Sequence, residues 1–153
     1  MNELLARLTG QPVRDNTQTN RTLDASPETF PLNRTLYADF SHDNTMVSIY
    51  SALGLFRQHL LPGQKLDPSH PSLLRTWILS SMVPFSGRVV VEKLECTAIP
   101  LPAATVVRIL VNDAVQPLEF CGGVAGLCEL HAFVESQRYA RHDGNGDFER
   151  CFN

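Results

Sequence analysis

The chain has 153 residues, a formal net charge of −3 at pH 7 and 43% hydrophobic residues, which is typical of one globular domain or of part of a larger one. Its 13 lysines and arginines form no long basic segment, so the charge pattern of a nucleic-acid-binding protein is missing. The longest uncharged stretch, Asn44 to Phe56, has 13 residues and is shorter than the ~20 apolar residues that span a bilayer, so we expect no membrane-spanning segment.

The first ten residues predict the last turns of an amphipathic helix. Leu4, Leu5 and Leu8 recur at helical spacing on one face, and Gly10 is a typical C-terminal stop. Acidic and basic side chains alternate with these leucines, so the segment lacks the basic start and the apolar run of a signal peptide. We therefore expect the chain to begin in the middle of a longer protein.

A strand, a turn and a helix are predicted next, after a polar surface connection over residues 11–34. The segment Thr35–Phe40 alternates apolar and polar side chains, with Tyr37 and Asp39 on one side, and this pattern predicts a short strand. From Thr45 onward, apolar residues return at helical spacing. The residues expected to cap or end this helix are Ser41, Asp43, Asn44 and Gly54.

Strands are predicted for the middle of the chain. Residues 57–73 are expected to form a loop, whereas Thr76–Leu79 and Ser86–Cys96 are expected to be strands, the second of them rich in valine. Two further β-rich runs flank Asn112 and Asp113, a residue pair that favours a two-residue hairpin turn.

A short helix is predicted near the C-terminus, after the glycine-rich segment between Cys121 and Cys128. Apolar residues share one helical face there, and the pattern fades at Arg141. The residues on this face are Leu130, Phe133, Val134 and Gln137. The residues that follow, as far as Cys151, are typical of turns.

Several patterns contain ligand-type residues but favour structural explanations. Asp143, Asn145 and Asp147 have the spacing of a calcium loop, yet Phe148 stands where the sharp turn needs glycine. The nearby cysteines and histidines lack the closely spaced pairs of a zinc site. The glycines after Cys121 do not follow the spacing of a phosphate-binding loop. We therefore expect no metal site and no cofactor.

His42 and Asp43 are the candidate functional residues. They follow the predicted strand and precede the predicted helix, a position where the N–H groups of a helix favour anions. A hydrolase triad of Ser41, His42 and Asp43 is excluded, because adjacent side chains point in different directions and cannot relay a proton along one line. From these residues alone, the simpler interpretation is that Asp43 caps the helix and His42 lies in a loop.

The segment LYADFSHDNTMVSIYSALGLF, residues 36–56, resembles the part of histidine acid phosphatases, in particular secreted fungal phytases, that carries a His-Asp pair. Further segments resemble this family in the same order, so the similarity runs over essentially the whole chain. They are LLARLTGQPV, VPFSGRVVVEKLEC, VRILVNDAVQPLEFCGG and FVESQRYAR. The resemblance implies an α/β fold of the phosphoglycerate-mutase type, a mixed sheet with flanking helices that is incomplete in this chain.

The same resemblance implies roles for the two candidate residues. The family hydrolyses phosphomonoesters through a phosphohistidine, so Asp43 would donate a proton to the leaving alkoxide and His42 would contact the phosphate group. An aspartate donor must be protonated when substrate binds, which suits an acidic medium. The family's R-H-G-x-R-x-P motif, which holds the nucleophilic histidine, does not occur in this sequence.

We therefore expect residues 1–153 to be the C-terminal part of a single histidine acid phosphatase domain, without its N-terminal catalytic motif. Expressed by itself, the chain should show no phosphatase activity and should fold poorly, because its strands would expose unpaired edges.

The four cysteines allow three pairings within the chain. The resemblance supports a local bridge between Cys121 and Cys128, which would close a short loop and stabilise the fold by about 2–3 kcal/mol in the chain-entropy account. It also implies that Cys96 and Cys151 pair with cysteines that lie upstream, outside this chain.

Cysteines together with Asn-x-Thr triplets at Asn20 and Asn33 indicate a secreted glycoprotein. By resemblance, the substrate is a small phosphomonoester such as phytate (myo-inositol hexakisphosphate). Arg88 within the valine-rich strand is either a buried ion-pair partner or a pocket cation, and the structural role is favoured. The alternative function is a catalytically inactive secreted remnant with a binding or structural role.

Overall fold

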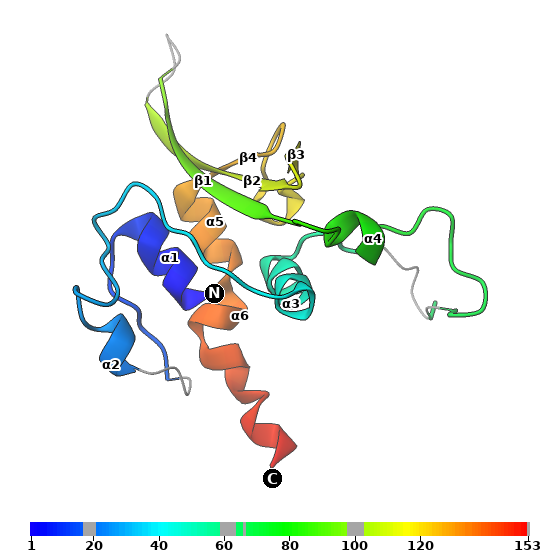
Figure 1. Ribbon diagram of the computed structural model, residues 1–153, viewed down its shortest axis with the longest axis horizontal. Helices are drawn as coiled ribbons and strands as arrows, with labels where there is room; N and C mark the ends of the chain where they lie inside the picture. Colours follow the sequence, from blue (N-terminus) through cyan, green and yellow to red (C-terminus); the bar gives the residue numbers. More distant parts are fainter. Residues whose placement is uncertain (17–20, 59–63, 66, 98–102, 153) are drawn as a thin grey trace.

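The computed structural model describes residues 1–16, 21–58, 64–65, 67–97 and 103–152. A four-stranded antiparallel sheet is covered on one face by helices (Figure 1). The strands are β1 (Val89–Cys96), β2 (Ala104–Val111), β3 (Ala114–Val115) and β4 (Leu127–Glu129). The α-helices are α1 (Asn2–Thr9), α2 (Arg21–Asp24), α3 (Asp43–Leu53), α4 (Leu79–Met82), α5 (Leu130–Ser136) and α6 (Arg138–Arg141). Short 3-10 turns are η1 (Glu119–Cys121), η2 (Asp143–Gly146) and η3 (Glu149–Cys151).

The sheet is built around β2, and the predicted hairpin is confirmed. β1 pairs with β2 along its whole length, while β3 and β4 both pair with the other edge of β2. Asn112 and Asp113 connect β2 to β3 with φ angles of 49° and 67°, the left-handed values that a type I′ turn requires at both positions. Among the described residues, the outer edge of β1 has no strand partner.

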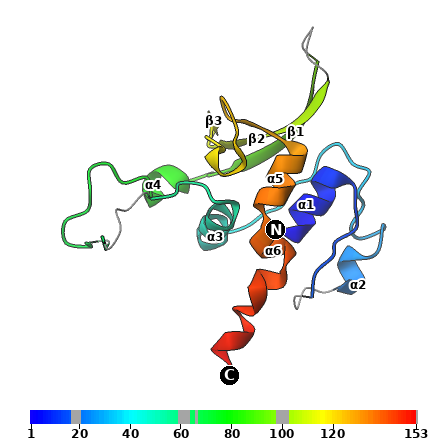
Figure 2. The same ribbon diagram turned by 180° about the vertical axis from the view of Figure 1, so that it is seen from behind.

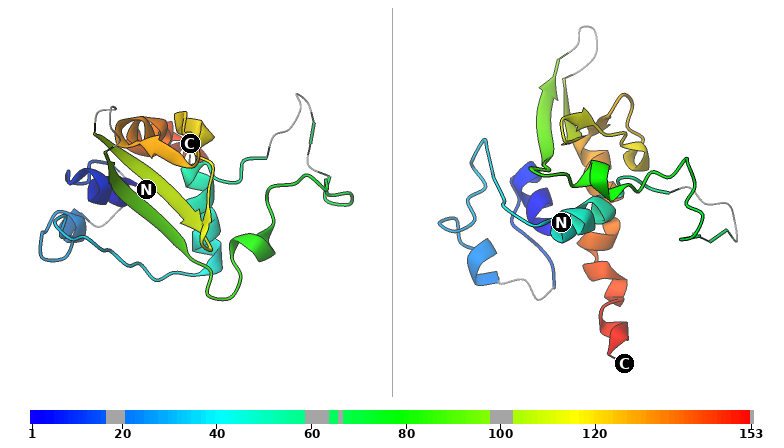
Figure 3. Two further views of the ribbon diagram at one scale, coloured as in Figure 1. Left: turned by 90° about the horizontal axis from the view of Figure 1, so that it is seen from above. Right: turned by 45° about the vertical axis from the view of Figure 1, so that its right-hand side comes forward.

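The core lies between this sheet and helices α1, α3 and α5, which lie on one face of the sheet (Figures 1 and 3). Alternate residues of β2 point into it, as the two-residue period of a strand requires. The largest fully buried side chains are Tyr50, Phe133, Leu53, Met82, Ile109, Leu118 and Val107. The α/β fold class is confirmed, and the strand pairs among the described residues are all antiparallel.

Three predicted helices are confirmed. α1 buries Leu5 and Leu8 and ends at Gly10, and α3 ends at Gly54. α5 buries Phe133 but ends at Ser136, so the helix predicted to fade at Arg141 is interrupted at Gln137, after which α6 continues the chain away from the sheet toward the C-terminal turns (Figure 2). α3 begins at Asp43, two residues before the predicted start.

Two predicted strands are wrong. The segment Thr35–Phe40 is coil, with Leu36 82% and Phe40 98% exposed. Alternation of side chains describes a strand only where an adjacent strand accepts its backbone hydrogen bonds, and no strand among the described residues does so here. The segment Thr76–Leu79 forms no strand either, since the backbone N–H of Thr76 donates to the side chain of Gln58 at 3.0 Å rather than to a strand, and α4 begins at Leu79.

The loops predicted over residues 11–34 and 57–73 agree in outline with the described part of the structure. The described residues of the 57–73 segment form no helix or strand, and the polar stretch 11–34 contains only the four-residue helix α2 within its described part. No helix in the described ranges combines the length and the hydropathy that crossing a membrane would need.

Candidate functional site

His42 and Asp43 stand together at the N-terminus of α3. His42 is the N-cap residue in an extended conformation, with φ −114° and ψ 163°, and its carbonyl oxygen accepts the N–H of Met46 at 3.0 Å. Asp43 is the first helical residue. Because the first N–H groups of a helix have no partner within it and carry partial positive charge, this end of an 11-residue helix suits an anionic group.

The side chain of Asp43 does not cap the helix as the simpler interpretation requires. The cap position belongs to His42, which makes no side-chain capping hydrogen bond, and Oδ1 of Asp43 accepts only the neighbouring N–H of Asn44 at 2.8 Å. Both side chains are exposed. Asp43 is therefore accessible to a ligand, and its second carboxylate oxygen is not committed to the helix.

The position of α3 is fixed by its buried face. Tyr50 and Leu53 are buried, and the Tyr50 ring meets the ring of Phe56 edge-on with centroids 5.7 Å apart. The hydroxyl of Tyr50 donates to the carbonyl oxygen of Met82 at 3.4 Å, and burial raises the pKa of this phenol. These contacts set the rotation of the helix and therefore the direction in which its first residues face.

The chain that enters α3 is held from the other side by Arg7 of α1. Nη1 and Nη2 of Arg7 donate to the two carboxylate oxygens of Asp39, at 2.5 and 3.3 Å. The guanidinium also lies 5.0 Å from the ring centroid of Phe30 and 5.0 Å from that of Tyr37. We call these four residues the Arg7 cluster.

The sequence reasoning missed the Arg7 cluster. Its one signal was the alternation that put Tyr37 and Asp39 on the same side of a predicted strand; the strand is wrong, but both side chains do meet Arg7. The partner could not be identified from the sequence, because Arg7 and Asp39 are 32 positions apart.

Arg88 has the predicted structural role. Nε of Arg88 donates to Oδ1 of Asp113 at 3.1 Å, and a second contact joins its Nη2 to Oδ2. The pair is exposed rather than buried, since 55% of the Arg88 side chain and 71% of the Asp113 side chain are accessible. It tethers the start of β1 to the hairpin turn.

The residues with calcium-loop spacing already have protein partners. Asp143 accepts the backbone N–H of Asn16 at 2.7 Å and its side-chain amide at 2.9 Å, and these hydrogen bonds lower the pKa of the Asp143 carboxyl. Asp147 accepts the hydroxyl of Tyr139 and the guanidinium of Arg150. No group of three or more His, Cys, Asp or Glu side chains suited to a metal ion occurs among the residues that the structure describes.

The bridge between Cys121 and Cys128 is confirmed, with their Cα atoms 6.3 Å apart. Cys96, half-buried at the end of β1, and Cys151, exposed in η3, are free thiols. Their pairing with upstream cysteines stays a prediction.

Of the two glycosylation candidates, Asn33 is exposed in the coil before α3. Asn20 lies outside the described residues.

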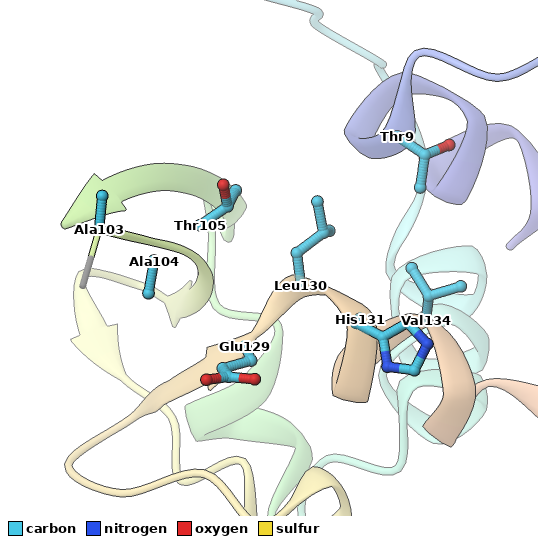
Figure 4. A pocket seen from close by; sticks show the side chains of 8 residues that line it. All are labelled: Thr9, Ala103, Ala104, Thr105, Glu129, Leu130, His131 and Val134. Atoms are coloured by element: carbon cyan, nitrogen blue, oxygen red, sulfur yellow. The ribbon is translucent and has the colours of Figure 1, made fainter.

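A second candidate location is an open hollow of about 510 Å³ beside the end of α1 (Figure 4). Its lining residues come from the ends of α1, β2, β4 and α5, and they do not include His42 or Asp43. Two of its polar side chains are committed elsewhere, since Thr9 donates to the carbonyl of Leu5 and Thr105 donates to the carboxylate of Glu95. Glu129 and His131 also line this hollow, which is separate from the His42–Asp43 pair.

Comparison with known proteins finds several similar sequences. Phytase A of Arthroderma benhamiae is 45% identical over 150 residues, a match that covers 96% of this chain and 32% of that protein. Phytase A of Aspergillus oryzae is 45% identical over 152 residues, and a Phytase A of Aspergillus terreus is 47% identical over 152 residues; each match covers 99% of this chain and 31% of the relative. The chain thus spans about a third of the length of these relatives.

A protein-family model also matches this chain. The model of the histidine phosphatase superfamily (branch 2) matches residues 1–112, which include α1, the Arg7 cluster, the His42–Asp43 pair and the β1–β2 hairpin. The resemblance seen in the sequence is thereby confirmed. Because this match extends over well more than half of the sequence, the chain belongs to the histidine phosphatase superfamily (branch 2).

Proposed function

We propose that residues 1–153 form the C-terminal part of a single phosphatase domain that hydrolyses phosphomonoesters, with phytate as a substrate. The observation that carries the proposal is the exposed His42–Asp43 pair at the N-terminus of α3. Support comes from the superfamily match and from relatives named Phytase A. The Cys121–Cys128 disulfide supports a secreted protein, because such bonds persist in oxidising compartments.

In the proposed reaction, Asp43 is the proton donor. A histidine from the part of the domain outside this chain attacks phosphorus, the bond from phosphorus to the ester oxygen breaks, and the departing alkoxide takes the proton of Asp43. Water then attacks the phosphohistidine and loses a proton to solvent, phosphate and free histidine result, and the Asp43 carboxylate is reprotonated from solvent for the next cycle. Because an inositol alkoxide is a poor leaving group, a positioned acid contributes ~10²–10⁴-fold to the rate.

His42 and the start of α3 hold the phosphate group in this proposal. A protonated histidine offers two N–H donors, and the helix N-terminus adds unpaired backbone donors and partial positive charge on the same side. The adjacent position of His42 and Asp43 on one N-terminus therefore lets one residue contact the phosphate while the other reaches the ester oxygen.

The test uses the full-length protein that contains this chain and compares two substrates. Asp43→Asn should lower kcat for phytate by ~10²–10⁴-fold. The loss with p-nitrophenyl phosphate should be much smaller, because nitrophenolate leaves without needing a proton.

The matched control is Asp113→Asn, which neutralises an exposed aspartate on the hairpin and should keep wild-type turnover. Equal losses on both substrates, or none on phytate, would refute the role of Asp43.

A further inference from the structure

The Arg7 cluster is the main attachment of the chain that leads into the candidate site. From Pro31 to Ser41, no backbone–backbone hydrogen bond is formed with any residue that the structure describes. Phe40, directly after Asp39, is 98% exposed and adds no packing. The segment passes beside α1 on its way from α2 to α3 (Figures 1 and 3), and it is at α1 that Arg7 holds it.

Arg7 is suited to hold this segment. Its side chain is only 18% exposed, and its planar guanidinium lies against two aromatic rings while binding both oxygens of Asp39. Nε of Arg7 is buried and has no hydrogen-bond partner among the described residues, so its two Nη atoms make the charge-neutralising contact with Asp39. A lysine could supply neither the bidentate contact nor the stacking geometry.

The distance along the chain couples this attachment to the site. His42 lies three residues after Asp39, which allows a reach of at most ~11 Å between their Cα atoms. On the other side, α3 is fixed through Tyr50 and Leu53 in the core. The His42–Asp43 pair therefore lies between two fixed points, one at Arg7 and one in α3.

We propose that Arg7 is a positioning residue for His42 and Asp43, acting through Asp39. The inference rests on the proposed function and adds to it a residue that touches neither phosphate nor leaving group. When the Arg7–Asp39 contact is lost, the coil from Pro31 to Ser41 is released from α1, and the first residues of α3 shift relative to the substrate. A displacement of about 1 Å at a reacting group can cost ~10²-fold in rate.

The experiment compares Arg7→Met, Arg7→Lys and Asp39→Asn in the full-length protein. Arg7→Met should lower kcat for phytate by ~10–100-fold while KM changes little. The loss with p-nitrophenyl phosphate should be much smaller, as expected for a misplaced proton donor. Asp39→Asn should behave in the same way, and because Asp39 is 72% exposed this variant folds even if Arg7→Met does not. Arg7→Lys keeps the positive charge but loses the bidentate contact and the stacking, so it should keep only part of the activity.

Two further measurements distinguish a positioning role of Arg7 from a general disruption of the fold. In an Asp43→Asn background, Arg7→Met should cause a smaller loss than in the wild-type background, because a proton donor that is already absent cannot be misplaced and only the displacement of His42 remains. After removal of N-linked glycans, trypsin should cleave on the C-terminal side of exposed Arg34 faster in Arg7→Met and Asp39→Asn than in wild type. Arg150→Met, which removes an exposed arginine–aspartate pair in the C-terminal tail, is the control and should change neither readout.

The outcomes for the two proposals are distinct. If Asp43→Asn shows the leaving-group dependence but Arg7→Met and Asp39→Asn do not, the positioning role is wrong and the proposed function stands. An Arg7→Met loss that adds fully to that of Asp43→Asn also overturns the positioning role. If Asp43→Asn itself shows no leaving-group dependence, the proposed function fails, whereas faster cleavage at Arg34 would still report the loss of the Arg7 attachment.

Discussion

Gly126, in the loop closed by the Cys121–Cys128 bridge, allows a sharp test of the packing around the hairpin. Its φ is +76°, and a Cβ added there would lie 2.3 Å from Cγ1 of Val115 in β3. Gly122 in the same loop has φ +71° and no atom within 4 Å of an added Cβ. Alanine at either position therefore has the same backbone cost, and only Gly126→Ala adds a clash.

The expected losses of stability follow from the backbone angle and the surroundings of each glycine. Alanine in the left-handed region costs ~1–2 kcal/mol, offset by ~0.4–1 kcal/mol because alanine restricts the unfolded chain. Gly122→Ala should therefore lower the free energy of unfolding by about 0–1.6 kcal/mol. Gly126→Ala should cost about 1 kcal/mol more than that, the low end of the range for overpacking, because the clashing Val115 side chain is 46% exposed and can partly turn away.

The assay is urea unfolding of the full-length protein with its disulfides intact, and the quantity measured is the difference between the two variants. Val115→Ala removes the clashing Cγ1 and should recover part of the extra loss when combined with Gly126→Ala, a coupling at the low end of the ~0.5–3 kcal/mol range for residues in contact. The reasoning is refuted if Gly126→Ala and Gly122→Ala are equally stable, or if Val115→Ala adds its cost independently.

Two further predictions concern the C-terminal turns and the coil before α3. The lowered pKa of Asp143 means that its contact with Asn16 stabilises the protein above the ordinary carboxyl pKa near 3.8 and is lost as the pH falls through the lower folded value. Asp143→Asn should therefore reduce the melting temperature at pH 6 and converge with wild type at strongly acid pH; a constant difference across this range would contradict the linkage. Exposed Asn33 should carry a glycan in the secreted protein, so Asn33→Gln should remove one glycan's mass, and intact-mass measurement showing no change would exclude it.

Local chemistry explains the elements that the sequence predicted well. In α1 and α5 the apolar period matches the helix, and in the Asn112–Asp113 turn the two residues tolerate the left-handed conformation that the hairpin demands. These signals act over a few residues and need no distant partner. The Cys121–Cys128 bridge belongs to the same class, because a separation of seven positions keeps the two thiols close.

The two strand predictions that proved wrong share a different cause. Thr35–Phe40 has the alternation of a strand, but a strand exists only where another edge pairs with it, and the structure instead ties this segment to α1 through the side chains of Tyr37 and Asp39. Thr76–Leu79 forms no strand: Thr76 is hydrogen-bonded to the side chain of Gln58, and α4 begins at Leu79. In both segments the residue pattern of a strand is present, but the part of the protein that each segment contacts determines which structure it adopts.

The sequence by itself determined α1, α3, α5, the hairpin and the identity of His42 and Asp43 as the residues to examine, because each rests on short-range spacing or on a contiguous motif. Only the tertiary structure decided that His42 rather than Asp43 takes the cap position, and that Arg7 holds the chain entering α3. Contacts across 32 positions depend on how helices and coil pack in three dimensions, and no local period in the sequence encodes them.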